Sequence, residues 1–430
     1  MPTMSAKIHI ERLMHRSSIA VAGESAASYS LIKLVPSGNE GTNSLPLSIA
    51  LVLDVSGSMY EEDGLGMSRL QRIQQAALAA MAKLKPEDTL ALVAFAHDAQ
   101  VVLSSTRMAD RGAVEDVIRR IDTFPVDPGG TAMDKGIALG LQEVEKGAGP
   151  GRVSQVVVLT DGETSGEESC RQFAQQAADK KIRLTMMGVG TEWNAPLIKD
   201  LSRLSDGRWC YIDVHQAQEA ERIFVEEFGR LSATVFTNVE LHLRPIKEVR
   251  IKRFRQVVPE IRELKLTEAG ERHLIAHLGT LEKEQARRYI LEMSLPRRPD
   301  GKYVITQMEI SYDLGAGRRE KNGPLPLEMQ YTAAGHGYVN AEVAKHIDEV
   351  QIFELNNNLQ KALAAEDAVE ARRLAENIAK KGDLMGPRAA KKTMLARQVL
   401  QEINAGGRVS KKTMLAVDDA ARMADEMPTG

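Results

Sequence analysis

Three short polar segments in the first half of the 430-residue chain carry side chains that suit a hard metal ion. They offer a carboxylate and two hydroxyls, then one hydroxyl, then a second carboxylate, from Asp54, Ser56, Ser58, Thr131 and Asp161. Mg²⁺ prefers about six oxygen ligands in an octahedron, with water in the positions that the protein leaves open. We therefore expect one divalent cation here, Mg²⁺ first with Mn²⁺ or Ca²⁺ as alternatives, bound without cysteine or histidine.

The places of these segments in the chain predict that they meet. Asp54 directly follows the apolar run 47–53, Thr131 ends the loop 127–131 before a helix-like segment, and Asp161 ends the apolar run 153–159. In an open α/β sheet, ligands bind where the strands end at their carboxyl edge. Each segment alone is also typical of a helix cap or a turn. Three such loops in one sheet favour the metal site over that simpler interpretation.

Apolar strand-like runs alternate with helix-period segments between residues 46 and 232. The expected strands are 47–53, 90–95, 153–159, 182–189 and 209–212, and the expected helices are 70–84, 113–121, 132–145, 168–180, 195–204 and 217–231. This alternation predicts a mostly parallel sheet with helices on both faces. Residues 99–103 follow the turn His97-Asp98 and are expected to form an antiparallel hairpin at the sheet edge.

The segments before and after this α/β region have a different sequence pattern. Residues 7–35 and 235–331 alternate apolar and polar side chains with Pro and Gly turns, which is typical of antiparallel strands. The few N-terminal strands could not bury an apolar face alone, so we predict one β-sandwich with the α/β domain inserted into it. From about residue 340 the pattern is helical. The predicted parts are 1–45 and 233–335 (sandwich), 46–232 (α/β domain) and 336–430 (helical region).

The pattern Asp54-x-Ser56-x-Ser58, then Thr131, then Asp161 in Thr-Asp-Gly resembles the metal-ion-dependent adhesion site of von Willebrand factor type A domains. The match covers all five positions and implies a Rossmann-like domain over about 46–232, of the bacterial cytoplasmic type. The resemblance implies that Ser56, Ser58 and Thr131 bind the metal directly, while Asp54 and Asp161 act through water. It also implies an open position on the metal, which such domains commonly fill with a partner's carboxylate.

The resemblance implies a non-enzymatic interaction module, a scaffold or adaptor whose partner is a protein that supplies Asp or Glu. Bacterial relatives are associated with MoxR-type AAA+ ATPases or with kinase and phosphatase systems, which is family context and rests on no residue of this chain. One alternative is a metal-dependent phosphohydrolase, since Asp54 after a buried strand is similar to the nucleophile of the haloacid-dehalogenase group. There Ser56 replaces a second Asp, and a serine could not act as the general acid. Another alternative is an assembly subunit that oligomerises through its helical region.

The amino-acid composition argues against several other classes of protein. Apolar residues make up 43% and charged residues 27% of the chain, which is the balance of a folded globular protein. A formal charge of −3 gives no overall field to attract nucleic acid. The sequence has neither an apolar run long enough to cross a membrane nor the apolar core of a signal peptide at its start. Two cysteines do not make a disulfide framework, so we expect a cytoplasmic location.

Three further groups of residues carry weaker signals. His273 and His277 are four apart, but the residues between them suggest a strand and no Glu follows the first His, which excludes a zinc-protease helix. They are expected to be solvated. The acidic run 61–63 is assigned no role. The sequence Lys-Lys-Thr-Met-Leu occurs at 391–395 and again at 411–415, and a protein-docking surface is a better interpretation of these lysines than phosphate binding.

Overall fold

The structure is a computed structural model that describes residues 7–21, 26–37, 44–62, 64, 66–123, 129–149, 151–213, 216, 218–283, 285–314, 318–335, 337–406 and 408–424. The chain divides into two compact units. One, the α/β unit, comprises residues 43–237 and 313–318. The other, the sandwich unit, comprises residues 1–42, 238–312 and 319–430 and includes the helical region.

A six-stranded sheet forms the centre of the α/β unit. Its strand order is β6-β5-β4-β7-β8-β9. The strands are β4 (Leu47–Asp54), β5 (Thr89–Phe95), β6 (Ala99–Arg107), β7 (Val153–Thr160), β8 (Arg183–Val189) and β9 (Trp209–Ile212). The pair β5–β6 is antiparallel and the other neighbours are parallel. The predicted mostly parallel sheet, with its antiparallel edge hairpin, is confirmed.

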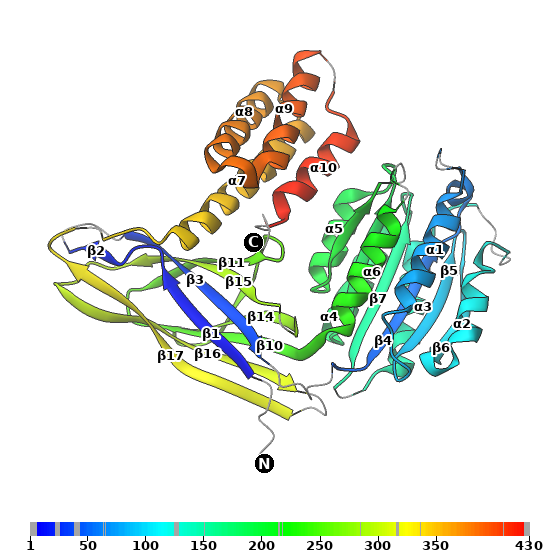
Figure 1. Ribbon diagram of the computed structural model, residues 1–430, viewed down its shortest axis with the longest axis horizontal. Coiled ribbons are helices and arrows are strands. Elements are labelled where there is room, and N and C mark those ends of the chain that lie inside the picture. The colour runs from blue at the N-terminus through cyan, green and yellow to red at the C-terminus, as the bar shows by residue number, and fades with distance from the viewer. Residues whose placement is uncertain are drawn as a thin grey trace. The chain divides into compact units, whose positions relative to one another are not determined.

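Helices cover both faces of this sheet (Figure 1). They are α1 (Arg69–Met81), α2 (Arg111–Ile118), α3 (Met133–Gly147), α4 (Glu167–Asp179), α5 (Ala195–Leu204) and α6 (Glu219–Ser232). Leu51 of β4 belongs to an apolar core with residues of α1, α2 and α6. On the other face, α3 lies so close that a Cβ on Gly140 would stand 2.7 Å from Val52 Cγ2. Burial on both faces explains why β4 is a continuous apolar run.

A buried carboxylate fixes α6 to the sheet. Glu227 Oε1 accepts hydrogen bonds from Gln155 Nε2 of β7 at 2.9 Å and from Thr185 Oγ1 of β8 at 3.0 Å. Arg230 Nη2 lies 2.6 Å from the same oxygen, and Arg208 Nη1 lies 3.5 Å from Oε2. Burial alone would raise the pKa of Glu227, but the two arginines and the hydrogen bonds hold it well below its usual range.

Two sheets make up the β-sandwich. Their orders are β1-β3-β15-β11-β12 and β13-β14-β10-β16-β17-β2. The strands are β1 (Lys7–Met14), β2 (Ser18–Ala20), β3 (Ala26–Ser37), β10 (Thr234–Pro245), β11 (Arg250–Val258), β12 (Arg262–Glu263), β13 (Leu266–Gly270), β14 (His273–Glu282), β15 (Arg287–Leu295), β16 (Gly301–Leu314) and β17 (Arg318–Thr332). Strand β3 pairs with β15, so the N-terminal strands are completed by strands after the insertion, as predicted. One short pairing, β2 with β17, is parallel.

The two ends of the inserted α/β domain lie next to each other. The Leu45 N–H donates a hydrogen bond to the Thr234 carbonyl at 2.8 Å, so the chain entering the α/β unit lies beside the chain leaving it. The Leu47 N–H donates to Asp88 Oδ1 at 2.8 Å. These bonds close the base of the inserted domain.

The described part of the C-terminal region contains the α-helices α7 (Ala341–Ala364), α8 (Ala368–Met385), α9 (Ala390–Asn404) and α10 (Lys411–Arg422). Helix α7 is buried on two sides. Its Val343 and Val350 pack with Leu31 and Ile290 of the sandwich. Its Ile352 joins a second apolar core with residues of α8, α9 and α10. The helical region and the sandwich thus share one helix.

The repeated pentapeptide marks the first turns of α9 and α10. Its threonines, Thr393 and Thr413, are both buried, and so are its leucines, Leu395 and Leu415. Lys392 is buried as well, which removes it from the lysines expected to face a partner. Within the part of the chain that the structure describes, no helix is long and apolar enough to span a membrane.

Candidate metal site

Asp54 is the last residue of β4, and its side chain is buried at the carboxyl edge of the sheet. Asp54 Oδ1 accepts a hydrogen bond from the Ser56 N–H at 2.9 Å, and Oδ2 accepts one from Thr160 Oγ1 at 2.7 Å. Burial raises the pKa of Asp54 to about 6, although the hydrogen bonds from Ser56 and Thr160 oppose this shift. A bound cation would offset the cost of burying this charge.

Ser56 and Ser58 lie in the turn that leaves β4. Their hydroxyl oxygens are 3.3 Å apart, and Ser58 Oγ donates to Asp161 Oδ1 at 2.7 Å. A short 3-10 helix, Gly57–Tyr60, follows, and Ser56 precedes it without making a side-chain capping bond. The alternative that Ser56 is only a helix cap therefore has no hydrogen bond to support it.

Asp161 follows β7 and faces the same turn. Its side chain is fully buried, and its second oxygen, Oδ2, lies 2.6 Å from Arg69 Nη1. Arg69 is the first residue of α1 and also pairs with Glu61, at 3.3 Å. The two carboxylates predicted to serve the metal are therefore both buried, and one arginine pairs with Asp161.

Thr131 approaches from the third loop. A Cβ placed on Gly162 would stand 3.5 Å from Thr131 Oγ1, so the threonine hydroxyl lies against the residue that follows Asp161. The Thr131 carbonyl accepts a hydrogen bond from Thr164 Oγ1 at 2.8 Å. Helix α3 begins after Ala132 with no side-chain cap, so the Thr131 hydroxyl is not the cap of that helix. Asp127 and Pro128 of this loop lie outside the described residues.

Four of the five predicted ligands, all except Thr131, thus form one chain of short contacts, and Thr131 lies beside it. The donors are two carboxylates and three hydroxyls on three loops at the carboxyl edge of a parallel sheet. An all-oxygen set of this kind fits a hard divalent cation and suits neither a soft metal nor a haem. Neutral hydroxyls as inner ligands would leave such a cation electron-poor and able to take an anion.

Two residues of the site were not assigned from the sequence. Thr160 holds Asp54 in place, and the only hint was its position beside Asp161. Arg69 contacts Asp161 across 92 positions of sequence. Its signal was weak: a basic residue at the first position of a helix, where the helix dipole disfavours positive charge.

A pair of histidines lies on the sandwich. His242 Nδ1 of β10 is 3.0 Å from His273 Nε2 of β14, and His242 Nε2 is 3.1 Å from Ser311 Oγ. His273 is therefore not simply solvated, which corrects the expectation, whereas His277 is 67% exposed beside Glu240. The described residues contain no group of three or more His, Cys, Asp or Glu side chains suited to a metal ion.

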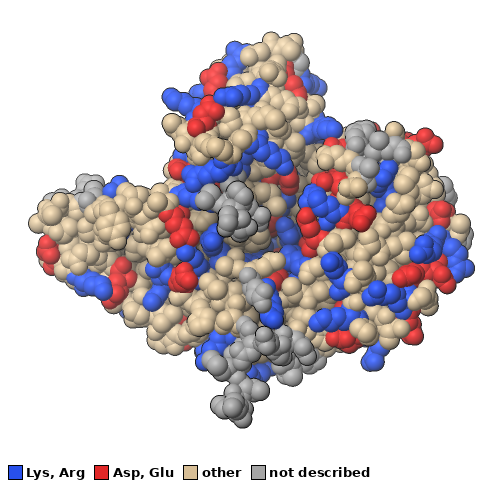
Figure 2. All heavy atoms as spheres, viewed as in Figure 1, with Lys and Arg blue, Asp and Glu red and all other residues tan. Residues whose placement is uncertain are grey.

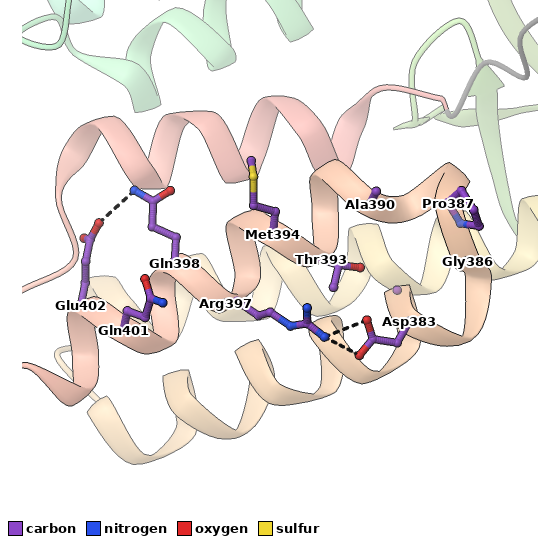
Figure 3. A pocket seen from close by; sticks show the side chains of 11 residues that line it. Asp383, Gly386, Pro387, Ala390, Thr393, Met394, Arg397, Gln398, Gln401 and Glu402 are labelled. Carbon is purple, nitrogen blue, oxygen red and sulfur yellow. Dashed lines mark hydrogen bonds and ion pairs between the residues drawn. The ribbon is translucent and has the colours of Figure 1, made fainter.

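A second candidate surface is a groove in the helical region (Figure 3). It has a volume of about 780 Å³ and lies between the end of α8 and α9. Asp383 and Arg397 form an ion pair across it at 2.9 Å, and Met394, 59% exposed, lies on its wall. On the face shown in Figure 2, basic and acidic side chains are interspersed. The residues that line this groove all belong to the described part of the chain, and they include no cluster of metal ligands.

Comparison with known proteins agrees with the fold and with the inserted domain. Residues 49–163 match the model of the von Willebrand factor type A domain family. The protein sll0103 of Synechocystis sp. is 30% identical over 343 residues, which are 78% of each chain. A solved von Willebrand factor type A protein from Catenulispora acidiphila covers 99% of both chains with a TM-score of 0.81 at 17% identity. The ArnB paralog VWA2 from Sulfolobus acidocaldarius covers 97% of this chain and 98% of its own with a TM-score of 0.57 at 12% identity.

The chain belongs to the family of proteins that carry a von Willebrand factor type A domain. The likeness to the two solved structures extends over the whole chain, so the sandwich and the helical region are part of the shared fold. Domains of this type generally mediate protein–protein interaction and commonly hold a divalent metal.

Proposed function

We propose that this chain is a non-enzymatic interaction module that holds one Mg²⁺ ion and uses it to bind an Asp or Glu carboxylate of a partner protein. The observation that carries the proposal is the chain of short contacts from Asp54 through Ser56 and Ser58 to Asp161. Two loops far apart in sequence bring these oxygens together, and Thr131 of a third loop lies beside them. A turn or cap would need only one of them.

Each residue has a separate part in this proposal. Ser56, Ser58 and Thr131 would hold the metal directly, and Asp54 and Asp161 would orient its water molecules. Thr160 keeps Asp54 in place through its hydrogen bond. The bound metal supplies an electron-poor centre for an incoming carboxylate. We also propose a cytoplasmic setting, which the two free cysteines, Cys170 and Cys210, suit.

The first test is direct metal binding, measured by calorimetry with Mg²⁺, Mn²⁺ and Ca²⁺. Wild-type protein should bind one ion, and Asp54→Ala and Ser58→Ala should bind it at least about tenfold more weakly. Asp98→Ala is the matched control, because Asp98 lies in the turn after β5, pairs with Lys135 at 3.0 Å and is exposed. Equal binding by wild type and Asp54→Ala would contradict the metal site.

The second test is partner capture from lysate of the source cell, with wild type and Asp54→Ala, each in Mg²⁺ and in EDTA. A protein retained only by wild type in Mg²⁺ is the expected result. Replacement of its exposed Asp and Glu residues one at a time should then identify the carboxylate that reaches the metal. Equal capture in all four conditions would contradict metal-mediated binding. The AAA+ ATPases and the kinase or phosphatase systems are the first partners to examine.

The geometry speaks against the phosphohydrolase alternative. A nucleophilic Asp must reach a phosphorus atom, but Asp54 is buried and both of its oxygens accept hydrogen bonds. Ser56 replaces the acid that such an enzyme would need. Absence of Mg²⁺-dependent hydrolysis of p-nitrophenyl phosphate is the expected result, and hydrolysis that is lost in Asp54→Asn would overturn the non-enzymatic proposal.

The assembly alternative has one structural feature in its favour, the groove between α8 and α9. Met394, which lines this groove, exposes 59% of its surface. If the helical region mediates self-association, Met394→Glu in the full chain should shift the protein to a smaller species in size-exclusion chromatography. An unchanged elution volume would remove this alternative.

A further inference from the structure

The metal site contains more buried negative charge than buried positive charge. Asp54 and Asp161 are both essentially inaccessible to solvent, and Ser58 links the two loops that carry them. A buried carboxylate is costly unless a cation or several hydrogen-bond donors face it. Asp54 receives two such donors, from Ser56 and Thr160. Asp161 receives one hydroxyl and the guanidinium of Arg69.

Arg69 is held where it can serve Asp161. Its N–H donates to the Glu61 carbonyl at 3.2 Å, and its Nη2 lies 3.3 Å from the Glu61 carboxylate. The preceding residue, Ser68, caps α1 through reciprocal hydrogen bonds with Gln71. The cap fixes the first turn of the helix, and this directs the Arg69 side chain to the loop that contains Asp161. Only 16% of that side chain is exposed.

We propose that Arg69 is a built-in counter-cation of the metal site, which neutralises Asp161 when no metal is bound and thereby lowers the affinity for the divalent ion. The inference rests on the proposed function, because it presumes that a cation binds beside Asp161. Arg69 is a positioning residue and not a metal ligand, since a guanidinium has no lone pair to donate.

Arg69 would therefore stabilise the metal-free protein and lower its affinity for the divalent ion. With Arg69 present, the metal-free protein has a positive charge beside Asp161, so binding a cation relieves less repulsion between the two buried carboxylates. Without Arg69, the metal-free protein is less stable and a divalent ion gains more by entering. The same arginine keeps the bound ion electron-poor, because its charge already satisfies one carboxylate oxygen. The ion then retains a stronger attraction for an external anion.

The test measures Mn²⁺ affinity by electron paramagnetic resonance on the full chain, without any partner. Arg69→Gln should bind Mn²⁺ about threefold to tenfold more tightly than wild type. Arg69→Lys, which keeps the charge, should remain within about twofold of wild type. Arg72→Gln removes the same charge from the same helix three residues along and should also remain within about twofold.

Thermal unfolding supplies the second readout. In EDTA, Arg69→Gln should melt below wild type, and its melting temperature should rise more on addition of Mn²⁺. If this variant is unfolded in EDTA, Mn²⁺ must restore its fold. Unchanged or weaker Mn²⁺ binding by Arg69→Gln, or no restoration by Mn²⁺, would overturn the inference. Failure of wild type itself to bind Mn²⁺ would instead overturn the proposed function, so the two outcomes are distinct.

Discussion

The α/β unit contains two buried carboxylate clusters with opposite charge balance. At the sheet edge the carboxylates of Asp54 and Asp161 are both buried, and one arginine, Arg69, pairs with Asp161. Under α6, the single carboxylate of Glu227 faces two arginines, Arg230 and Arg208, and further donors from Gln155 and Thr185. A cluster in which hydrogen-bond donors outnumber carboxylates is self-sufficient, because its negative charge is compensated without an external cation. An excess of carboxylates leaves room for an external cation, and for this reason we propose a binding site at the sheet edge and a structural network at Glu227.

The largest effect should come from the self-sufficient cluster. Glu227→Gln leaves the partly buried Arg230 and Arg208 without the buried carboxylate that they face, and we expect it to destabilise the α/β unit by about 3–5 kcal/mol. Urea unfolding with and without Mg²⁺ would measure this loss. The loss should be the same in both conditions, because the cluster does not involve the metal. A loss below about 1 kcal/mol would mean that Glu227 is not the anchor of α6.

The same cluster predicts an acid limit to stability. The pKa of Glu227 in the folded protein lies below its ordinary value of 4.5, so its charged form is stabilised by folding. Its contribution is therefore fully present above about pH 4.5 and is lost as the pH falls further. Wild type should lose stability between about pH 4.5 and 3 more steeply than Glu227→Gln. Parallel curves for the two proteins would contradict this assignment.

An effect of intermediate size and opposite sign is expected at the sheet edge. In EDTA, Asp54→Asn should stabilise the protein by about 1–2 kcal/mol, because it removes one of the two carboxylates that are buried at this edge of the sheet. In saturating Mg²⁺ the order should reverse, since only wild type gains binding energy. Thermal unfolding of both proteins in both conditions would show this crossing. Destabilisation of Asp54→Asn in EDTA would place Asp54 with the structural cluster instead.

The smallest effect concerns Thr131, which lies beside the other proposed ligands but does not cap α3. Thr131→Ala should weaken Mn²⁺ binding by about threefold to tenfold and change the melting temperature in EDTA by no more than about 1 °C. Thr164→Ala, which removes the hydroxyl that bonds the Thr131 carbonyl, separates loss of a ligand from loss of loop order. Unaltered Mn²⁺ affinity in Thr131→Ala would exclude its hydroxyl as a ligand.

The sequence predicted what depends on local pattern. The continuous apolar run of β4 and the alternating polar turn after it identify the strand, its end and the first three candidate ligands, because these features need only neighbouring residues. A β-sandwich built from strands on both sides of the insertion was also predictable, because the few N-terminal strands could not bury an apolar face alone. The contacts of Arg69 with Asp161, and of Glu227 with its two arginines, depend on which faces of α1 and α6 meet the sheet. Helix periodicity gives a polar or apolar face but not the partner across it.

Three smaller differences from the sequence-based predictions concern His273, the pairing of β2 with β17, and Lys392. His273 meets His242 across neighbouring strands, and strand order was not predictable from the pattern of either strand. The pairing of β2 with β17 involves three residues, Ser18, Ile19 and Ala20, too few to carry a periodic signal. Lys392 was expected at the surface because lysine usually is, but the first turn of α9 buries it.

Because a hydrogen bond joins Leu45 to Thr234, the inserted domain is suited to transfer into another protein. Since the first and last residues of the domain lie side by side, a host sheet has to accommodate only a loop with neighbouring ends, whatever the length of chain between them. Loop closure entropy grows slowly with length, so such an insertion costs the host little more than a short hairpin would. The same junction offers a place to cut: joining residues 44 and 235 through a few glycines should leave the host strands in register, and the excised piece could be transplanted into another β-sandwich.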